Sequence, residues 1–269
     1  MSILSTDVSR ELPKLMVAPN GARRTKADHP ALPMTIEETV ATAVECFDAG
    51  ADGLHLHIRD EAGAHTLDIA LYKEALQELA VAVPKMAVQI TTEAVGRYEP
   101  SEQRDLVIQL RPQLVSISIT EMTSDNDPVA AMEFYQMCHS ENISVQHILY
   151  LADDVSAWFD LMHQAKLETR SRQLIFVLGR YTQGQASDPA MLQEYLQRLQ
   201  YLKLDYAEID WSVCAFGQQE TACLVAAHQA GGKMRVGFEN SLWNADGTVA
   251  DSNAERVREI VANVREVSS

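Results

Sequence analysis

Basic residues are scarce in this chain. It has 22 lysines and arginines against 38 aspartates and glutamates, which leaves a formal net charge of -16 at pH 7. So acidic a surface repels phosphate backbones, and we therefore expect neither nucleic acid nor an anionic membrane as a partner. An anionic small molecule is not excluded, because a local group of arginines can reverse the sign of the field inside one pocket.

Cysteines and long apolar runs are also few. The four cysteines, Cys46, Cys138, Cys214 and Cys223, form no C-x-x-C pair and no disulfide-like framework. Reduced thiols in apolar stretches predict a cytoplasmic protein. No run of about 18 apolar residues is present, so we expect no membrane span. Residues 1–15 lack the basic start and apolar core of a signal peptide.

Hydrophobic residues make up 46% of the 269 residues, enough for a packed core. The length is typical of one eight-stranded α/β barrel. No linker rich in glycine, serine or proline interrupts the chain. We therefore predict a single domain over residues 1–269.

Short apolar runs alternate regularly with longer amphipathic segments. The runs of strand length are Lys14–Ala18, Gly53–Ile58, Met86–Thr91, Leu114–Ile119, Ser144–Tyr150, Leu174–Leu178, Ala207–Val213 and Met234–Phe238. The segments of helical period are Thr35–Ala49, Leu67–Ala82, Pro100–Gln109, Pro128–Ser140, Asp153–Lys166, Pro189–Leu199, Gln218–Ala230 and Asn253–Val264. This alternation predicts an α/β fold, a closed (β/α)8 TIM barrel.

A doubly wound open sheet is the alternative to the barrel. Such sheets usually carry a glycine-rich fingerprint after the first strand. Here the first strand leads into Ala18–Ala22, which lacks that spacing.

The second predicted strand carries two histidines, His55 and His57, in an H-x-H pattern. Alternate residues of a strand face the same side, so both imidazoles project together and fit two ligands of one divalent metal. Glu239 ends the eighth strand at the same face of the barrel. Two histidines and a glutamate leave coordination positions open, as a catalytic site requires. The alternative is a pair of core histidines satisfied by their neighbours.

Two other histidines are weaker candidates. His147 lies on the fifth strand and is a candidate for the pocket wall, whereas His65 falls in a loop.

Five segments in order carry a resemblance to a known family. They are Pro19–Ala22, His55–Asp60, Gln89–Gly96, Phe176–Gly179 and Arg235–Glu239. Together they resemble the β-keto acid cleavage enzymes over nearly the whole chain. The resemblance implies a zinc-dependent barrel, usually a homo-oligomer. It also implies the condensation of a β-keto acid with acetyl-CoA, giving acetoacetate and the CoA ester of the remaining fragment.

Several residues receive roles alongside this resemblance. Arg235 lies four residues before Glu239, so both can face the interior, and we assign it charge stabilisation and proton relay; an ion pair at the barrel bottom is the alternative. Thr91 and Thr92 end the third strand, and the resemblance favours Thr91 as the substrate-binding hydroxyl. Asn20, in the first loop, is a further substrate-binding candidate.

One departure from the family concerns the catalytic acid. The family commonly has aspartate after the glutamate ligand, whereas this chain has Asn240, which cannot accept a proton. Glu121, after the fourth strand, and Glu93, after the third, are the available acids. Glu121 matches a substrate-pocket position of the family, so we prefer it.

The other departure is in the first loop, where Arg23 and Arg24 follow Gly-Ala. Family members with a cationic substrate have an acid there. Arg23 therefore favours an anionic substrate tail or the phosphates of CoA, unless the loop is simply solvated. Gly179 and Arg180, after the sixth strand, have the freedom and the charge to approach a phosphate of CoA.

Two other functions remain open. One is a metal-dependent aldolase or hydrolase on the same barrel that uses no CoA. The other is a barrel that binds a small acid without turnover. Turnover that requires added acetyl-CoA would distinguish the condensing enzyme from both of these alternatives.

Overall fold

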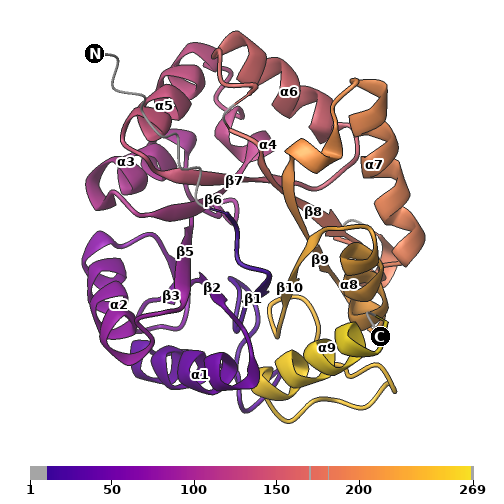
Figure 1. Ribbon diagram of the computed structural model, residues 1–269. Coiled ribbons are helices and arrows are strands. Elements are labelled where there is room, and N and C mark those ends of the chain that lie inside the picture. The colour runs from indigo at the N-terminus through magenta and orange to yellow at the C-terminus, as the bar shows by residue number, and fades with distance from the viewer. Residues whose placement is uncertain (1–10, 170, 181, 268–269) are drawn as a thin grey trace, which may run out of the picture.

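The strands close into a single parallel barrel in the computed structural model, which describes residues 11–169, 171–180 and 182–267 (Figure 1). Around the barrel the order is β1-β10-β9-β8-β7-β6-β5-β2, and β2 pairs with β1 to complete the ring. The predicted (β/α)8 barrel is therefore confirmed. Residues 1–10, where we expect no signal peptide, lie outside the described residues.

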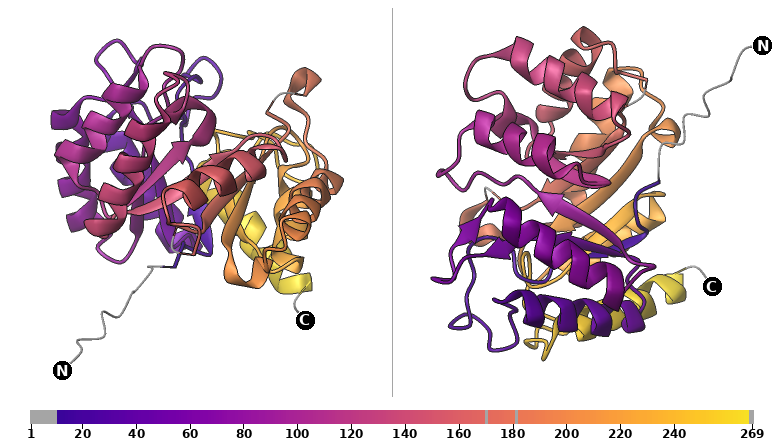
Figure 2. Two further views of the ribbon diagram at one scale, coloured as in Figure 1. Left: turned by 90° about the horizontal axis from the view of Figure 1, so that it is seen from above. Right: turned by 90° about the vertical axis from the view of Figure 1, so that its left-hand side faces the viewer.

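The barrel strands are β1 (Leu15–Val17), β2 (Gly53–Leu56), β5 (Ala87–Thr91), β6 (Leu114–Ser118), β7 (Ser144–Leu149), β8 (Gln173–Leu178), β9 (Asp210–Ala215) and β10 (Lys233–Val236). The outer helices are α1 (Ile36–Ala49), α2 (Ile69–Ala82), α3 (Pro100–Leu110), α5 (Pro128–Ser140), α6 (Asp154–Gln164), α7 (Leu192–Tyr201), α8 (Glu220–Gln229) and α9 (Asn253–Val267). A short helix, α4 (Ile119–Met122), follows β6, and β3 (Ile58–Arg59) pairs antiparallel with β4 (His65–Thr66). Figure 2 shows the helices covering the outside of the strands.

Local sequence explains where the helices begin and end. Thr35 and Glu38 form the predicted capping box of α1, and Gly50 ends that helix in the left-handed conformation. Pro100 and Pro128 occupy the first turns of their helices, as expected. Pro189 instead begins a 3-10 turn, and α7 starts three residues later.

The predicted seventh strand is displaced. β9 begins at Asp210, because residues Tyr206–Glu208 form a 3-10 turn. Asp210 accepts a hydrogen bond from the amide of Leu12 at 2.7 Å and pairs with Lys233 Nζ at 2.6 Å. These contacts fix the start of the strand, and the prediction of Ala207–Val213 ran three residues too early.

The prediction for His147 is also wrong. Its imidazole lies behind the barrel wall, where Nε2 bonds Ser171 Oγ at 2.8 Å and the ring packs against Tyr135 and Trp158. The neighbouring Gln146 faces the interior instead and bonds Gln89 across it. Because successive strand residues face opposite sides, an inward Gln146 forces His147 outward.

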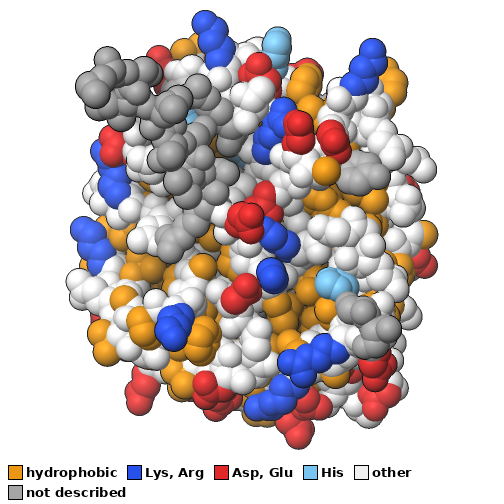
Figure 3. All heavy atoms as spheres, in the orientation of Figure 1, with side chains coloured by type: hydrophobic (Ala, Val, Ile, Leu, Met, Phe, Trp, Pro, Cys, Tyr) orange, Lys and Arg blue, Asp and Glu red, His pale blue; other side chains and the backbone are white. Residues whose placement is uncertain are grey.

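Acidic and basic side chains are interspersed over the face that Figure 3 shows, so the acidic excess forms no single patch there. None of the helices in the described part of the chain is long and apolar enough to cross a membrane.

Candidate functional site

A cavity of about 100 Å³ opens at the carboxyl ends of the barrel strands. Its lining comes from the ends of β1, β2, β5, β7, β8, β9 and β10 and the loops that follow them: Asn20, Gly21, Ala22, Arg23, Arg24, His55, Thr91, Glu93, Ile148, Tyr150, Val177, Arg180, Gln185, Phe216, Arg235 and Glu239. Active sites of this fold lie at this end.

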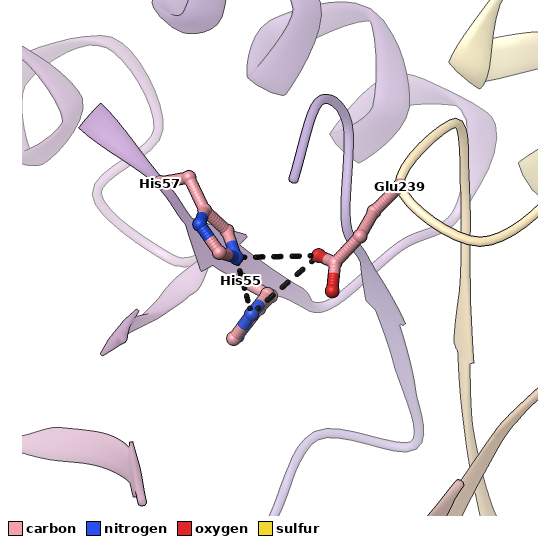
Figure 4. A group of neighbouring side chains, drawn as sticks. All are labelled: His55, His57 and Glu239. Atoms are coloured by element: carbon pink, nitrogen blue, oxygen red, sulfur yellow. Dashed lines mark hydrogen bonds and ion pairs between the residues drawn. The ribbon is translucent and has the colours of Figure 1, made fainter. Parts of the chain in front are cut away.

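The three predicted metal ligands converge at this cavity (Figure 4). Nε2 of His55 and Nε2 of His57 lie 3.1 Å apart, and each lies 3.5 Å from Oε2 of Glu239. Ligand atoms about 2.0–2.1 Å from a tetrahedral Zn²⁺ are roughly 3.3 Å apart, so this spacing fits one zinc ion.

The unpaired atoms of the group also fit a cation. Oε2 of Glu239 is buried and has no hydrogen-bond partner among the described residues. Both imidazoles are about 1% exposed. Three electron-pair donors that face one largely buried point are costly unless a cation lies between them.

Burial and neighbouring charges hold His55 and Glu239 in the protonation states that can bind a metal. Burial lowers the pKa of His55 well below its usual value, with Arg235 adding to the effect. Burial alone would raise the pKa of Glu239, but Arg235 and the two imidazoles lower it well below the normal range. A neutral His55 imidazole and an ionised Glu239 carboxylate, the forms that bind a metal, are therefore favoured.

Two glycines let the first and last loops approach each other. Gly21 has φ +61°, and a Cβ there would lie 2.5 Å from Cγ of Glu239. Gly237 has φ +138°, and a Cβ there would lie 2.5 Å from the carbonyl oxygen of Ala18. Glu239 therefore reaches the histidines only because these two positions lack side chains.

Arg235 lies inside the barrel and not at its bottom. Its NH2 donates to Oε1 of Glu239 at 3.1 Å and to Sγ of Cys214 at 3.3 Å. Nε and NH1 are buried and have no partner among the described residues. The guanidinium borders the cavity, where its positive charge can stabilise an oxyanion.

Thr91 and Thr92 point in different directions. Thr91 lines the cavity, and its hydroxyl accepts from the amide of Glu93 at 3.1 Å. Thr92 Oγ1 instead faces the carbonyl of Ser116 on β6 at 3.4 Å. Asn20 lines the cavity; its amide nitrogen donates to the carbonyl oxygen of Pro33, and its Oδ1 has no partner in the part of the chain that the structure describes.

Arg23 and its neighbour Arg24 have different environments. Arg24 donates to the carbonyl oxygens of Phe238 and Asn240, and so ties the first loop to the last. Arg59 NH2 holds the same loop through the carbonyl oxygens of Gly21 and Arg24, at 2.6 and 2.9 Å. Arg23 is exposed on the cavity rim and has no hydrogen bond or ion pair with the rest of the described chain.

Arg180 and Gly179 also differ. Arg180 lines the cavity, lies 5.2 Å from the centre of the Phe216 ring and 3.8 Å from Oε1 of Glu93. Gly179 is absent from the lining and shapes the loop: at φ +81°, its Cβ would lie 2.7 Å from the amide nitrogen of Ser187.

Glu121 and Glu93, the two candidate acids, have different environments. Glu121 does not line the cavity; Oε2 accepts from the amide of Ala94 and from Gln103, each at 3.0 Å. Burial raises its pKa. Glu93 does line the cavity, and its Oε2 lies 3.9 Å from Nε2 of His57.

Asn240 is fully buried and also lies outside the cavity lining. Neither atom of its amide has a partner among the described residues, while its carbonyl oxygen accepts from Gly217 and Arg24.

His65, a weak candidate from the sequence, lies directly beside the three proposed metal ligands. It is 3% exposed, its Nδ1 lies 3.4 Å from Nδ1 of His57, and burial lowers its pKa to about 3. Its position in the sequence, eight residues after His57, could have indicated this contact. The short antiparallel β3–β4 pair brings the chain back toward His57.

Comparison with known proteins agrees with this geometry. A family profile described as beta-keto acid cleavage enzyme matches residues 14–269. The chain belongs to this family. The predicted membership, and with it the expectation of an enzyme, is therefore confirmed.

Curated relatives extend over most of the chain. A 3-keto-5-aminohexanoate cleavage enzyme from Acetoanaerobium sticklandii is 26% identical and is covered over 89% of its length, against 91% of this chain. A 3-oxoadipate:acetyl-CoA acetyltransferase from Cupriavidus necator is 25% identical, with 92% of this chain and 87% of the relative covered.

Solved structures of low identity share the fold. ObcA bound to oxaloacetate aligns with a TM-score of 0.69 at 15% identity over 89% of this chain, which spans 65% of that protein. A type I 3-dehydroquinate dehydratase from Clostridium difficile aligns with a TM-score of 0.64 at 10% identity, with 96% of this chain and 94% of that one covered.

Proposed function

We propose that this member of the family is a zinc-dependent acyltransferase that condenses a β-keto acid with acetyl-CoA, releasing acetoacetate and a new CoA ester. One observation carries the proposal: His55, His57 and Glu239 present three electron-pair donors to one point in a cavity at the catalytic end of the barrel. The acetyl-CoA dependence in the name of the Cupriavidus necator relative supports the choice of co-substrate.

The metal position suits the chemistry of a β-keto acid. Zinc held by His55, His57 and Glu239 would supply Lewis acidity to a bound β-keto acid, which would make its C2 protons more acidic. The Arg235 guanidinium, which borders the cavity and has two donors without a partner among the described residues, stabilises the negative charge that develops on the substrate. The Thr91 hydroxyl orients the substrate from the β5 side of the cavity.

Glu93 is the general base in this proposal, whereas the sequence alone favoured Glu121. Glu93 borders the cavity beside the metal ligands, whereas both donors to Glu121 Oε2 belong to the surrounding scaffold. A general base must lie within reach of the proton that it removes. Asn240 then serves the loop through its backbone carbonyl.

Arg23 holds the far end of the substrate. Four arginines border the cavity, and Arg24, Arg180 and Arg235 already contact carbonyl or carboxylate groups of the protein. Arg23 keeps its full hydrogen-bonding capacity, so it favours a substrate with a second carboxylate. Arg180 and the Gly179 turn receive the CoA moiety.

The cytoplasm and a homo-oligomer belong to the same proposal. The four cysteines are free and buried, which suits a reducing compartment. The homo-oligomer is expected because the family that the chain resembles usually forms one.

The test is an assay of purified protein loaded with zinc. A panel of β-keto acids, with and without a second carboxylate, is incubated with acetyl-CoA, and acetoacetate is measured. Acetoacetate formed only when both acetyl-CoA and zinc are present supports the proposal. Carbon–carbon cleavage without CoA would replace it with an aldolase, and binding of acids without any turnover would replace it with a binding barrel.

A further inference from the structure

We propose that His65 and Gln89 are positioning residues that lock the two histidine ligands in the one tautomer that can bind the metal. The inference rests on the zinc site of the proposed function, and it concerns metal affinity and not turnover. A histidine that binds a metal through Nε2 must carry its proton on Nδ1. Two separate hydrogen-bonded chains impose this arrangement, one on each ligand.

The first chain crosses the interior of the barrel and begins at β8. Gln146 Nε2 lies 3.1 Å from the carbonyl oxygen of Leu174, which can only accept, and 2.8 Å from Oγ of Ser212. This fixes the orientation of the Gln146 amide, so its Oε1 accepts from Nε2 of Gln89 at 2.8 Å.

Gln89 is thereby oriented as well. With its nitrogen facing Gln146, its Oε1 must face His55, and it lies 2.8 Å from Nδ1. An amide oxygen has no proton to donate, so Nδ1 of His55 carries the hydrogen. Nε2 is then bare and faces Glu239. Gln89 and Gln146 are at most 1% exposed, so water does not compete for these bonds.

The second chain begins in the loop after β5. The carbonyl oxygen of Glu93 lies 3.0 Å from Nε2 of His65, so that nitrogen carries the hydrogen. In the tautomer that this bond selects, His65 presents the lone pair of Nδ1, which lies 3.4 Å from Nδ1 of His57. Nδ1 of His57 therefore donates, and its Nε2 is bare.

Both chains reach the same result from different elements. Each starts at a backbone carbonyl, which cannot reverse its role, and each ends at a bare Nε2. The 3.1 Å between the two Nε2 atoms is then a contact of two lone pairs and not a hydrogen bond. A cation between them is the arrangement that the surrounding bonds prepare.

The experiment measures the zinc dissociation constant of the full chain by competition with a chromogenic chelator. His65→Phe removes the acceptor for His57 and should weaken zinc binding by about 10–100-fold. Gln89→Leu should weaken it by a similar factor through His55. His65→Asn restores an acceptor near the position of Nδ1, so it should recover most of the affinity.

His147→Phe is the matched control. It removes another buried neutral histidine with one hydrogen bond, but from behind the barrel wall. A role of His65 in stability alone would lower the melting temperature of the metal-free protein as the control does and leave zinc affinity unchanged. That result, or equal loss of affinity in His65→Phe and His147→Phe, would overturn the inference.

The two proposals fail in different ways. Absence of acetoacetate formation overturns the acyl transfer, and the difference in zinc affinity can still be measured. Equal zinc affinities of wild type, His65→Phe and Gln89→Leu overturn the positioning role, and turnover can still be assayed.

Discussion

Arg235 and Glu239 meet at the end of β10, where NH2 of the arginine donates to Oε1 of the glutamate at 3.1 Å. The two carboxylate oxygens therefore have different partners: Oε1 is held by the guanidinium, and Oε2 lies 3.5 Å from Nε2 of both His55 and His57. Nε and NH1 of the same arginine have no partner within the described ranges. One ion pair therefore orients the carboxylate that we propose as a metal ligand and places a guanidinium beside it.

Loss of a metal ligand should abolish both zinc and activity. We expect His55→Ala or His57→Ala to retain well under one zinc per chain, because two ligands do not hold the ion against a chelator. Elemental analysis after dialysis measures this. His163→Ala, on the exposed side of α6, is the control and should keep its zinc. A stoichiometric ion in either ligand variant would remove those residues from the site.

Arg235→Lys should separate metal binding from turnover. A lysine keeps the charge but lacks the planar fork, so it cannot hold Glu239 and bind an oxyanion together. We expect bound zinc to persist while kcat falls by about 10²–10³, the cost of losing one fixed donor to an oxyanion. Zinc content and steady-state kinetics are measured on one preparation. Wild-type kcat would make Arg235 a structural residue.

Substitution of Arg23 should act mainly on the substrate. Loss of a hydrogen bond to a charged group costs about 1.5–3 kcal/mol, so Arg23→Ala should lower kcat/KM for a dicarboxylic β-keto acid by roughly 10–150-fold. The main effect should be a higher KM, and monocarboxylic substrates should change little. Lys26→Ala, whose ammonium pairs with Glu38 at 2.8 Å, is the control in the same loop. Equal losses for both substrate classes would argue against a tail-binding role.

The acids should differ in their importance for turnover. Glu93→Gln removes the carboxylate beside the metal ligands and should lower kcat by about 10²–10⁴, the usual contribution of a general base. Glu121→Gln keeps an oxygen that accepts from Ala94 and should retain most of the activity. Both kcat values are compared at saturating acetyl-CoA. The reverse order would return the acid role to Glu121.

His147 should make the protein less stable in acid. Burial lowers its pKa from 6.5 to about 3, so between these values the unfolded chain binds a proton that the folded chain does not. The free energy of unfolding therefore falls as pH drops through this window, by up to about 1.4 kcal/mol per pH unit for this group. His147→Phe should reduce that slope. Urea unfolding of both proteins without metal, from pH 7 to 4.5, measures it, and parallel curves would contradict the assignment.

The sequence by itself determined the barrel and the three residues that we propose as metal ligands. The hydrophobic periods of strands and helices depend only on residues close in sequence, so the sequence alone reveals them. The carboxyl ends of all the parallel strands then lie at one face of the barrel. The spacing of His55 and His57 places both on one side of a strand, and Glu239 ends another strand at the same face. Those relations hold in any closed barrel, whatever the loops do.

Tertiary structure decided which side chains enter the cavity. Barrel strands are buried on both sides, so hydrophobic alternation does not tell Gln146 from His147 or Thr91 from Thr92. The choice between Glu93 and Glu121, and the pairing of His65 with His57, depend on where loops pass one another. Such contacts join residues distant in sequence, as Gly21 against Glu239 illustrates, and only the closed barrel brings them together.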